Sequence, residues 1–268
     1  MWVGCLRTLI LSLCVLACNA KEQQSDVNGF ALKKTAFPTS IIDVCWENRS
    51  HADVELRALR PFFEQHAREQ FARTAVTLQG WLDCKDPDAS KSEIRITWWD
   101  KGEAPAVMVD GASQIGNGTV YGQRIQAVEQ HVKSDVRAMP TLALNSEAWR
   151  EVLSLRGRDV AIADMKSKAL HELGHAIGLL HEHAREDSTC EKREKVEMHL
   201  KYWQKAEEGL AAVMASIFKT QKFDELSVMN YCRLEQLQAT GRTLGFSEGD
   251  VETINLLYAG MPTGKRFP

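Results

Sequence analysis

Short apolar runs separated by polar residues mark the strands that the chain is expected to form. In residues 92–99 the apolar side chains fall at every second position, with Arg95 and Thr97 between them. This alternation predicts a half-buried strand. Further apolar runs predict short strands at residues 41–46, 76–81, 106–109 and 141–144.

Two longer segments have the composition of helices. Residues 53–75 place apolar side chains at intervals that suit a helix, and Pro61 is expected to start, kink or interrupt it because proline has no N–H to donate. Residues 161–180 are rich in Ala, Leu, Ile and Met, which is typical of a buried helix.

The first 20 residues are expected to be a leader. Arg7 precedes an apolar run that is too short to span a bilayer, which is the pattern of a signal peptide. Two cleavage sites compete. One resembles a bacterial lipobox and places the cut before Cys18, which would then carry lipid; the other uses the small residues at 18–20 for ordinary secretion. The lipobox fits better because a cysteine follows a small residue directly after the apolar run.

The rest of the chain is expected to form one domain. Residues 21–40 are polar and hold little that could be buried, so they predict a tether. Residues 41–262 suffice for one domain with a sizeable core, followed by a short tail at 263–268. The net charge of −3, without a basic stripe, gives nucleic-acid binding no support, and we expect a monomer.

Four cysteines fall within the expected domain: Cys45, Cys84, Cys190 and Cys232. An even number in an exported protein predicts two disulfides, and four cysteines allow three pairings. We favour Cys45–Cys84, because both lie in the N-terminal half. Cys190 would then pair with Cys232, which would hold two segments together beside the candidate site described next.

The candidate chemistry lies between His171 and His181, in the string His-Glu-Leu-Gly-His-Ala-Ile-Gly-Leu-Leu-His. On a helix His171 and His175 lie one turn apart on one face, with Glu172 beside them, which is a zinc-binding arrangement. Gly178 can take the left-handed conformation that ends a helix, so that His181 can return as a third ligand. Three imidazole ligands leave a fourth position for water, as in catalytic zinc sites.

The alternative for this stretch is a core helix with incidental histidines. Burying three histidines and a glutamate without a metal would be costly, so we favour the zinc site. We expect His183 at the surface, because a fourth imidazole would close the site to substrate. The scattered histidines, including His66, are expected to face solvent.

The longer string 171–187 resembles the active-site motif of the metzincin peptidases, and within them that of the astacins. Astacins carry a glutamate, an arginine and an aspartate at the spacings of Glu182, Arg185 and Asp187. The resemblance is specific over residues 162–187 and 224–258 and only general over residues 40–160.

A second match lies downstream. Ser227-Val228-Met229-Asn230-Tyr231 resembles the Met-turn, a tight turn that passes beneath the zinc of metzincins. Residues 246–258 resemble the last helix of astacins and matrixins. The resemblance implies an α+β metzincin catalytic domain with a mixed five-stranded twisted sheet, a long active-site helix, a Met-turn and a C-terminal helix.

The same resemblance implies a zinc-dependent endopeptidase that binds a protein or peptide substrate in extended form. Glu172 would act as general base on a metal-activated water, and Tyr231 would assist the transition state. Met229 would support the site from below. In astacins the glutamate that matches Glu182 binds the freed N-terminus of the mature enzyme; a lipidated tether that ends far upstream would not do that, so Glu182 is expected to form a local ion pair instead. The enzyme would be exported, either as an outer-membrane lipoprotein or as a secreted protein.

Two alternatives remain. A matrixin-like peptidase is the second choice within the metzincins, and Tyr231 argues against it because matrixins lack a tyrosine two residues after the methionine. An exported zinc-containing binding module without catalysis is the other. The intact Glu172 argues against it, since a binding site has no need of a carboxylate beside the metal.

Overall fold

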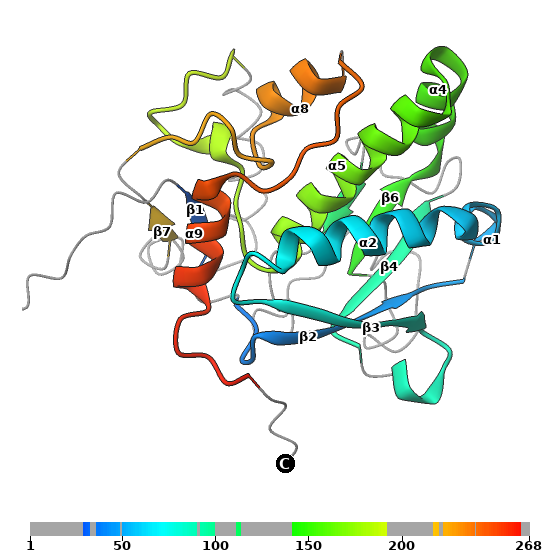
Figure 1. Cartoon of the computed structure of the whole chain (residues 1–268), viewed down its shortest axis with the longest axis horizontal. Coiled ribbons are helices and arrows are strands. Elements are labelled where there is room, and N and C mark those ends of the chain that lie inside the picture. Colours follow the sequence, from blue (N-terminus) through cyan, green and yellow to red (C-terminus); the bar gives the residue numbers. More distant parts are fainter. Residues whose placement is uncertain are drawn as a thin grey trace, which may run out of the picture.

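The computed structural model describes residues 29–32, 36–48, 50–89, 92–99, 111–113, 141–191, 217–219, 222–238 and 240–263 (Figure 1). The leader with Cys18, the strand expected at 106–109 and most of the expected tail lie outside these residues. None of the helices that the structure describes has the length and apolarity that a membrane span requires.

A five-stranded sheet carries the first half of the domain. Its spatial order is β3-β2-β4-β6-β5. The strands are β2 (Ile41–Trp46), β3 (Thr77–Asp83), β4 (Ile94–Trp99), β5 (Gly111–Ser113) and β6 (Leu142–Asn145). The first four in spatial order pair in parallel, and β5 pairs antiparallel with β6 at the edge. The predicted mixed five-stranded sheet is therefore confirmed.

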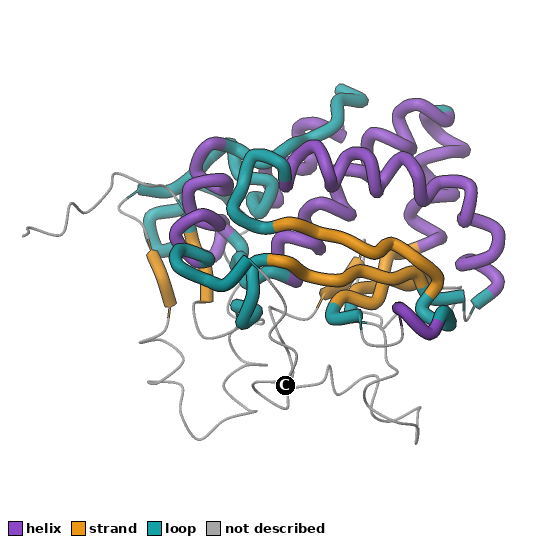
Figure 2. Tube along the Cα trace, turned by 60° about the horizontal axis from the view of Figure 1, so that its bottom comes forward, coloured by secondary structure: helices purple, strands orange, loops and turns teal. Residues whose placement is uncertain are grey.

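Helices cover one side of this sheet, as Figure 2 shows. They are α1 (His51–Glu55), the 3-10 turn η2 (Leu56–Leu59), α2 (Arg60–Phe71), α4 (Ser146–Arg156) and α5 (Arg158–Ala176). Pro61 lies in the first turn of α2, where its missing N–H costs nothing, so the helix expected over 53–75 is divided before it. The long helix α5 packs against α2, α4 and the strands β5 and β6.

Strand β4 differs from the half-buried strand that its alternation predicts. Arg95 and Thr97 are as buried as the apolar residues beside them. Their polar atoms have partners: an Arg95 nitrogen lies 2.7 Å from Oε1 of Glu47, and the Thr97 hydroxyl donates to Oδ2 of Asp53 at 2.9 Å. Polar side chains can be buried in a sheet where their polar atoms are paired in this way.

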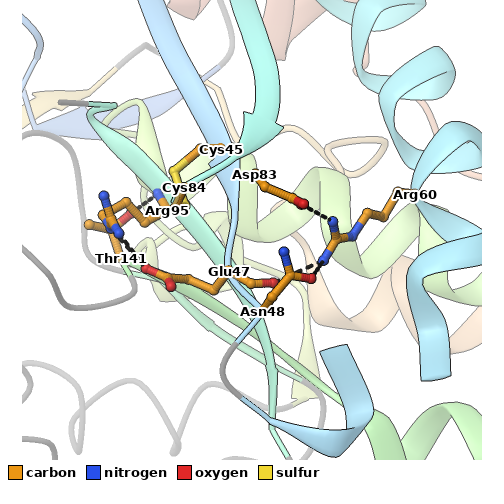
Figure 3. The surroundings of a disulfide bond; sticks show 8 residues. All are labelled: Cys45, Glu47, Asn48, Arg60, Asp83, Cys84, Arg95 and Thr141. Atoms are coloured by element: carbon orange, nitrogen blue, oxygen red, sulfur yellow. Dashed lines mark hydrogen bonds and ion pairs between the residues drawn. A yellow bond between two sulfur atoms is a disulfide. The ribbon is translucent and has the colours of Figure 1, made fainter. Parts of the chain in front are cut away.

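Two disulfides are present, with the pairing that the sequence analysis favours. Cys45–Cys84 ties β2 to the turn after β3 and lies close to the Glu47–Arg95 pair (Figure 3). Cys190–Cys232 joins the segment after the histidine motif to the segment after the Met-turn.

The second half of the chain holds the remaining elements. They are η6 (Glu182–Ala184), β7 (Ile217–Lys219), α8 (Tyr231–Gln238) and α9 (Glu248–Leu257); the first half also holds β1 (Phe30–Leu32) and the 3-10 turn η3 (Pro87–Ala89). Ser247 caps α9, because its hydroxyl accepts from the N–H of Asp250 and the Asp250 carboxylate accepts from the N–H of Ser247. The C-terminal helix implied by the resemblance is therefore present.

The expected tether over residues 21–40 is wrong for its second part. Strand β1 (Phe30–Leu32) pairs antiparallel with β7, and the N–H of Leu180 donates to the carbonyl oxygen of Phe30 at 2.8 Å. Ala31 and Phe37 are buried in the main core. A few apolar residues in a polar segment suffice for this, because backbone pairing requires no particular side chain. The domain therefore extends N-terminally beyond residue 41.

Candidate zinc site

Helix α5 brings two of the expected ligands together. His171 and His175 lie in its last turns, and their ring centroids are 4.7 Å apart. Both side chains are buried, as expected for a face that is turned toward the core. Glu172 follows His171 on the same helix and is also buried, at 5% exposed.

Gly178 ends the helix and reverses the chain. Its φ of 109° lies in the region that favours glycine. The N–H of Gly178 donates to the carbonyl of His175, and the N–H of Leu179 donates to that of Gly174, both at 2.9 Å. This pair of bonds is a Schellman motif, which closes a helix C-terminus. The chain then returns, so that His181 faces the two helical histidines.

The three histidines converge through one kind of atom. Nε2 of His181 lies 3.1 Å from Nε2 of His171 and 2.9 Å from Nε2 of His175. On their other sides, Nδ1 of His171 lies 2.9 Å from the carbonyl oxygen of Val228, and Nδ1 of His175 lies 2.8 Å from that of Leu179. A carbonyl oxygen only accepts, so each Nδ1 must carry the proton.

This pattern leaves two Nε2 lone pairs directed at a common point. Lone pairs cannot hydrogen-bond to one another, so the arrangement fits a cation among the three nitrogens. Tetrahedral zinc with ligands at about 2.0–2.1 Å would separate its nitrogens by about 3.3 Å, close to the spacings observed. The carbonyl partners fix the tautomer and orientation of the rings of His171 and His175, as such partners do for histidine ligands of zinc.

The Met-turn lies beside the histidines. The side chain of Met229 is buried beneath α5, and its carbonyl oxygen accepts from the N–H of Glu182 at 3.1 Å. Gly174 makes the close approach possible, since a Cβ atom there would lie 2.6 Å from Sδ of Met229. The turn is therefore in contact with both segments that carry the histidines.

Tyr231 follows the Met-turn and meets the histidine cluster with its ring. The ring centroid lies 5.2 Å from that of His171 and 4.6 Å from that of His181. Its ring plane is within 22° of that of His171. Tyr231 therefore lies beside the histidines, as its resemblance to the Met-turn tyrosine of astacins predicts.

Glu182 and Arg185, which follow His181 in the chain, are both buried and lie close to each other. Arg185 makes two hydrogen bonds to the carboxylate of Asp187, each 2.9 Å long, and one to the carbonyl oxygen of Gly29 at 3.0 Å. Oε2 of Glu182 lies 3.6 Å from Arg185 and accepts from the N–H of Asp224. Burial raises the pKa of Glu182 to about 8.

Residues 162–259 match the model of the astacin family of peptidases. Over these residues the chain is similar to the astacin peptidases. The match covers both histidine-bearing segments, the Met-turn and α9. The matching family is that of the astacins and not that of the matrixins, the second choice from the sequence. No curated protein matches the chain in sequence.

Solved structures that are similar to the chain include those of myroilysin and of a fish hatching enzyme. Myroilysin is 15% identical, with 86% of this chain and 98% of that chain covered and a TM-score of 0.49. High choriolytic enzyme 1, a hatching enzyme zinc-protease from the medaka Oryzias latipes, is 17% identical, with 82% and 90% covered and a TM-score of 0.35.

Two histidines lie in the interior and not at the surface that their sequence context predicts. His183 is fully buried and its ring lies 4.5 Å from that of Tyr231. His66 is also buried, and its Nε2 lies 2.8 Å from the carbonyl oxygen of Leu244. Solvent-facing positions were expected for both, and no local pattern distinguishes a buried histidine whose partner is a distant backbone carbonyl.

Asp250 in α9 contacts the Met-turn, a role that the sequence does not predict. The residue is fully enclosed, and its carboxylate accepts from the Ser227 hydroxyl at 2.6 Å and from the Val228 N–H at 3.0 Å. Burial raises the pKa of Asp250 to about 6. The Ser-x-x-Asp pattern at 247–250 predicts a helix cap. It is the only local signal for Asp250, and it does not reveal that the same carboxylate also contacts the Met-turn.

Proposed function

We propose that the chain is an endopeptidase in which His171, His175 and His181 hold zinc and Glu172 is the general base. The observation that supports this most directly is the convergence of three Nε2 atoms while the Nδ1 atoms of His171 and His175 face backbone carbonyls. The astacin-family match over residues 162–259 supports the same assignment.

Bound zinc supplies Lewis acidity, which polarises the scissile carbonyl and lowers the pKa of a water molecule. The carboxylate of Glu172 takes a proton from the attacking water and delivers it to the leaving amine. Its position suits that role, because it adjoins His171 on α5 and its side chain is shielded from bulk solvent.

Tyr231 is proposed to donate its hydroxyl proton in a hydrogen bond to the oxyanion that develops on the scissile carbonyl. A donor aimed at such an oxyanion is commonly worth roughly 3 kcal/mol, or about a hundredfold in rate. The ring of Tyr231 lies against those of His171 and His181 and therefore borders the reaction centre. Met229, Gly178 and Glu182 support the site without touching the substrate.

The substrate is a protein or peptide, as the peptidase family implies. We propose that it binds in extended form and pairs with an exposed strand edge, which offers backbone hydrogen bonds. Strand β5 lies at one edge of the sheet and in contact with α5, so it is the edge nearest the histidine helix.

To test the function, purified zinc-loaded protein is incubated with a library of peptides prepared from a proteome, and the cleavage sites are mapped by mass spectrometry. Glu172→Ala is the matched control, because it removes the proposed base and leaves all three histidines. We expect the variant to keep its zinc and its melting temperature and to lose nearly all cleavage. Near-normal turnover by zinc-loaded Glu172→Ala would overturn the general-base assignment.

The binding-module alternative gives a different result in the same assay. A module without catalysis would yield no cleavage sites from the wild-type protein, with or without zinc. For the enzyme, removal of zinc by a chelator should abolish cleavage, and added zinc should restore it.

Export is supported by the two disulfides, which form in oxidising compartments. We further propose that the chain is monomeric and that Cys18 carries lipid, which would hold the enzyme at a bacterial membrane. The Leu-Ala-Cys sequence that closes the apolar run supports this. A Cys18→Ser protein should move to the soluble fraction, and one that stays equally membrane-bound would contradict the lipid anchor.

A further inference from the structure

The ring of His183 lies against the proposed transition-state donor. His183 is fully buried, its ring centroid is 4.5 Å from that of Tyr231, and the two planes are within 24° of parallel. The N–H of Tyr231 also points to Nδ1 of His183, at 3.5 Å. His183 does not belong to the group of histidines whose nitrogens converge, so its contact with Tyr231 calls for another explanation.

The segment that carries His183 is itself held in place. It belongs to the short 3-10 turn η6, in which the N–H of Ala184 donates to the carbonyl of His181 at 2.9 Å. The first residue of η6, Glu182, is bonded through its N–H to the carbonyl of Met229, two residues before Tyr231. His183 and Tyr231 are therefore fixed to the same backbone unit.

A phenol donor needs such a support. The Tyr231 ring turns about two side-chain torsions, and a catalytic donor must be held within roughly 0.5 Å and 10–20° of its working position. The ring of His171 is also nearly parallel to Tyr231, but its centroid is farther away, at 5.2 Å. His183 thus supplies the closest parallel ring among the described residues that contact Tyr231.

We propose that His183 is a positioning residue, whose buried ring stacks on Tyr231 and holds the phenol hydroxyl where the oxyanion develops. The inference rests on the proposed role of Tyr231 and adds to it the residue that orients the donor. His183 also packs against His181, with ring centroids 4.7 Å apart, but it is not one of the three histidines whose nitrogens converge, so its proposed action is through Tyr231.

The test is a double-mutant cycle with zinc-loaded protein. His183→Asn removes the ring and keeps an acceptor near the position of Nδ1, and Tyr231→Phe removes only the hydroxyl. With Tyr231 present, His183→Asn should lower kcat roughly tenfold with KM little changed. The size follows from the free energy of a stacked aromatic pair, which corresponds to a change of up to about tenfold in rate. In the Tyr231→Phe background, the same substitution should leave kcat within about twofold, because the donor it orients is already absent.

A second readout follows the tyrosine itself. The chain has 4 tyrosines, so fluorotyrosine labelling gives 4 fluorine resonances, and Tyr231→Phe identifies one by its disappearance. We expect His183→Asn to shift or broaden that resonance and leave the others in place. His66→Gln, which alters a buried histidine away from the cluster, serves as the control and should leave the Tyr231 resonance unmoved.

The outcomes separate the two proposals. If Tyr231→Phe alone keeps its kcat, the donor role of Tyr231 fails and the positioning role fails with it. If Tyr231→Phe lowers kcat but His183→Asn has the same effect in both backgrounds, or leaves the Tyr231 resonance unmoved, only the positioning role is overturned. If His183→Asn loses zinc or folds poorly, His183→Phe, which keeps a flat ring, must retain kcat within about threefold for the proposal to stand.

Discussion

The backbone N–H of Val228 donates to the carboxylate of Asp250. The carbonyl oxygen of Val228 in turn accepts from Nδ1 of His171. Asp250, in the C-terminal helix α9, is therefore connected through Val228 to His171, a proposed zinc ligand. The Ser227 hydroxyl donates to the same carboxylate at 2.6 Å, so Asp250 holds the beginning of the Met-turn at two points.

The first prediction concerns this link. Asp250→Asn replaces one acceptor oxygen with a donor that faces N–H and O–H groups, so the Met-turn should loosen. We expect a loss of about 1–3 kcal/mol in the free energy of unfolding, since a buried donor loses its partner. Zinc affinity should fall about tenfold or more, as when other outer partners of zinc ligands are changed.

Denaturant unfolding and competition with a zinc-binding dye would measure the two effects. Glu248→Gln is the matched control, because it neutralises an exposed carboxylate in the same first turn of α9. It should change neither quantity appreciably. Equal zinc affinity in Asp250→Asn and wild type would show that the Met-turn does not depend on this carboxylate.

The second prediction concerns the close approach of Gly174 to Met229. Gly174→Ala should raise the helix propensity of α5 by about 1 kcal/mol, but its Cβ would meet Sδ of Met229 in a packed core. Overpacking commonly costs about 1–3 kcal/mol, so we expect a net loss of stability. In a Met229→Ala background the same substitution should cost less or become favourable. An identical cost in both backgrounds would disprove the clash, and urea unfolding of the four proteins decides.

The third prediction compares the two disulfides. Cys45–Cys84 and Cys190–Cys232 close segments of 39 and 42 residues, so chain entropy predicts nearly the same stability loss for each, about 4 kcal/mol. Their positions differ, since Cys232 adjoins Tyr231. Replacing the Cys190–Cys232 pair by serines should therefore lower kcat at a temperature where both variants remain folded, whereas replacing the Cys45–Cys84 pair should not.

Calorimetry would establish the stability of each pair variant, and turnover of a fixed peptide would establish kcat. If the two variants lose equal activity per unit of lost stability, the Cys190–Cys232 bridge has no local role at the site.

The sequence predicts the parts of this domain that depend on local pattern. The spacing of His171 and His175 follows from helix geometry, and the turn at Gly178 follows from the conformations open to glycine. Strands β2, β3, β4 and β6 follow from short apolar runs, whereas no such run predicts the edge strand β5 at Gly111–Ser113. Each of these features is fixed by residues within one or two turns of chain, so one segment suffices to reveal it.

The features that the sequence does not predict depend on distant partners. Arg95 looks exposed in an alternating strand, but it is buried and pairs with the carboxylate of Glu47, the residue that follows the neighbouring strand β2. The segment at residues 29–32 looks like a tether until β7 pairs with it. His183 and His66 are buried against Tyr231 and the carbonyl of Leu244, which are far away in sequence.

The last prediction follows from the burial of His66. Burial lowers the pKa of His66 from its ordinary value of 6.5, although the contact with the Leu244 carbonyl opposes the change. Above pH 6.5 the imidazole is neutral in both the folded and the unfolded chain, so its contribution to stability is complete. As the pH falls below 6.5, the unfolded chain binds a proton that the folded chain resists, and stability is lost by at most about 1.4 kcal/mol per pH unit until the lowered pKa is passed.

His66→Gln is the matched comparison for this pH dependence, because its amide can donate to the Leu244 carbonyl and does not titrate. Zinc binding also weakens in acid, but equally in both proteins, so the difference between their unfolding free energies isolates His66. We expect wild type to lose stability relative to His66→Gln between about pH 7 and pH 5, measured by urea unfolding at half-unit intervals. Parallel stability curves over that range would mean that His66 titrates alike in the folded and unfolded chains.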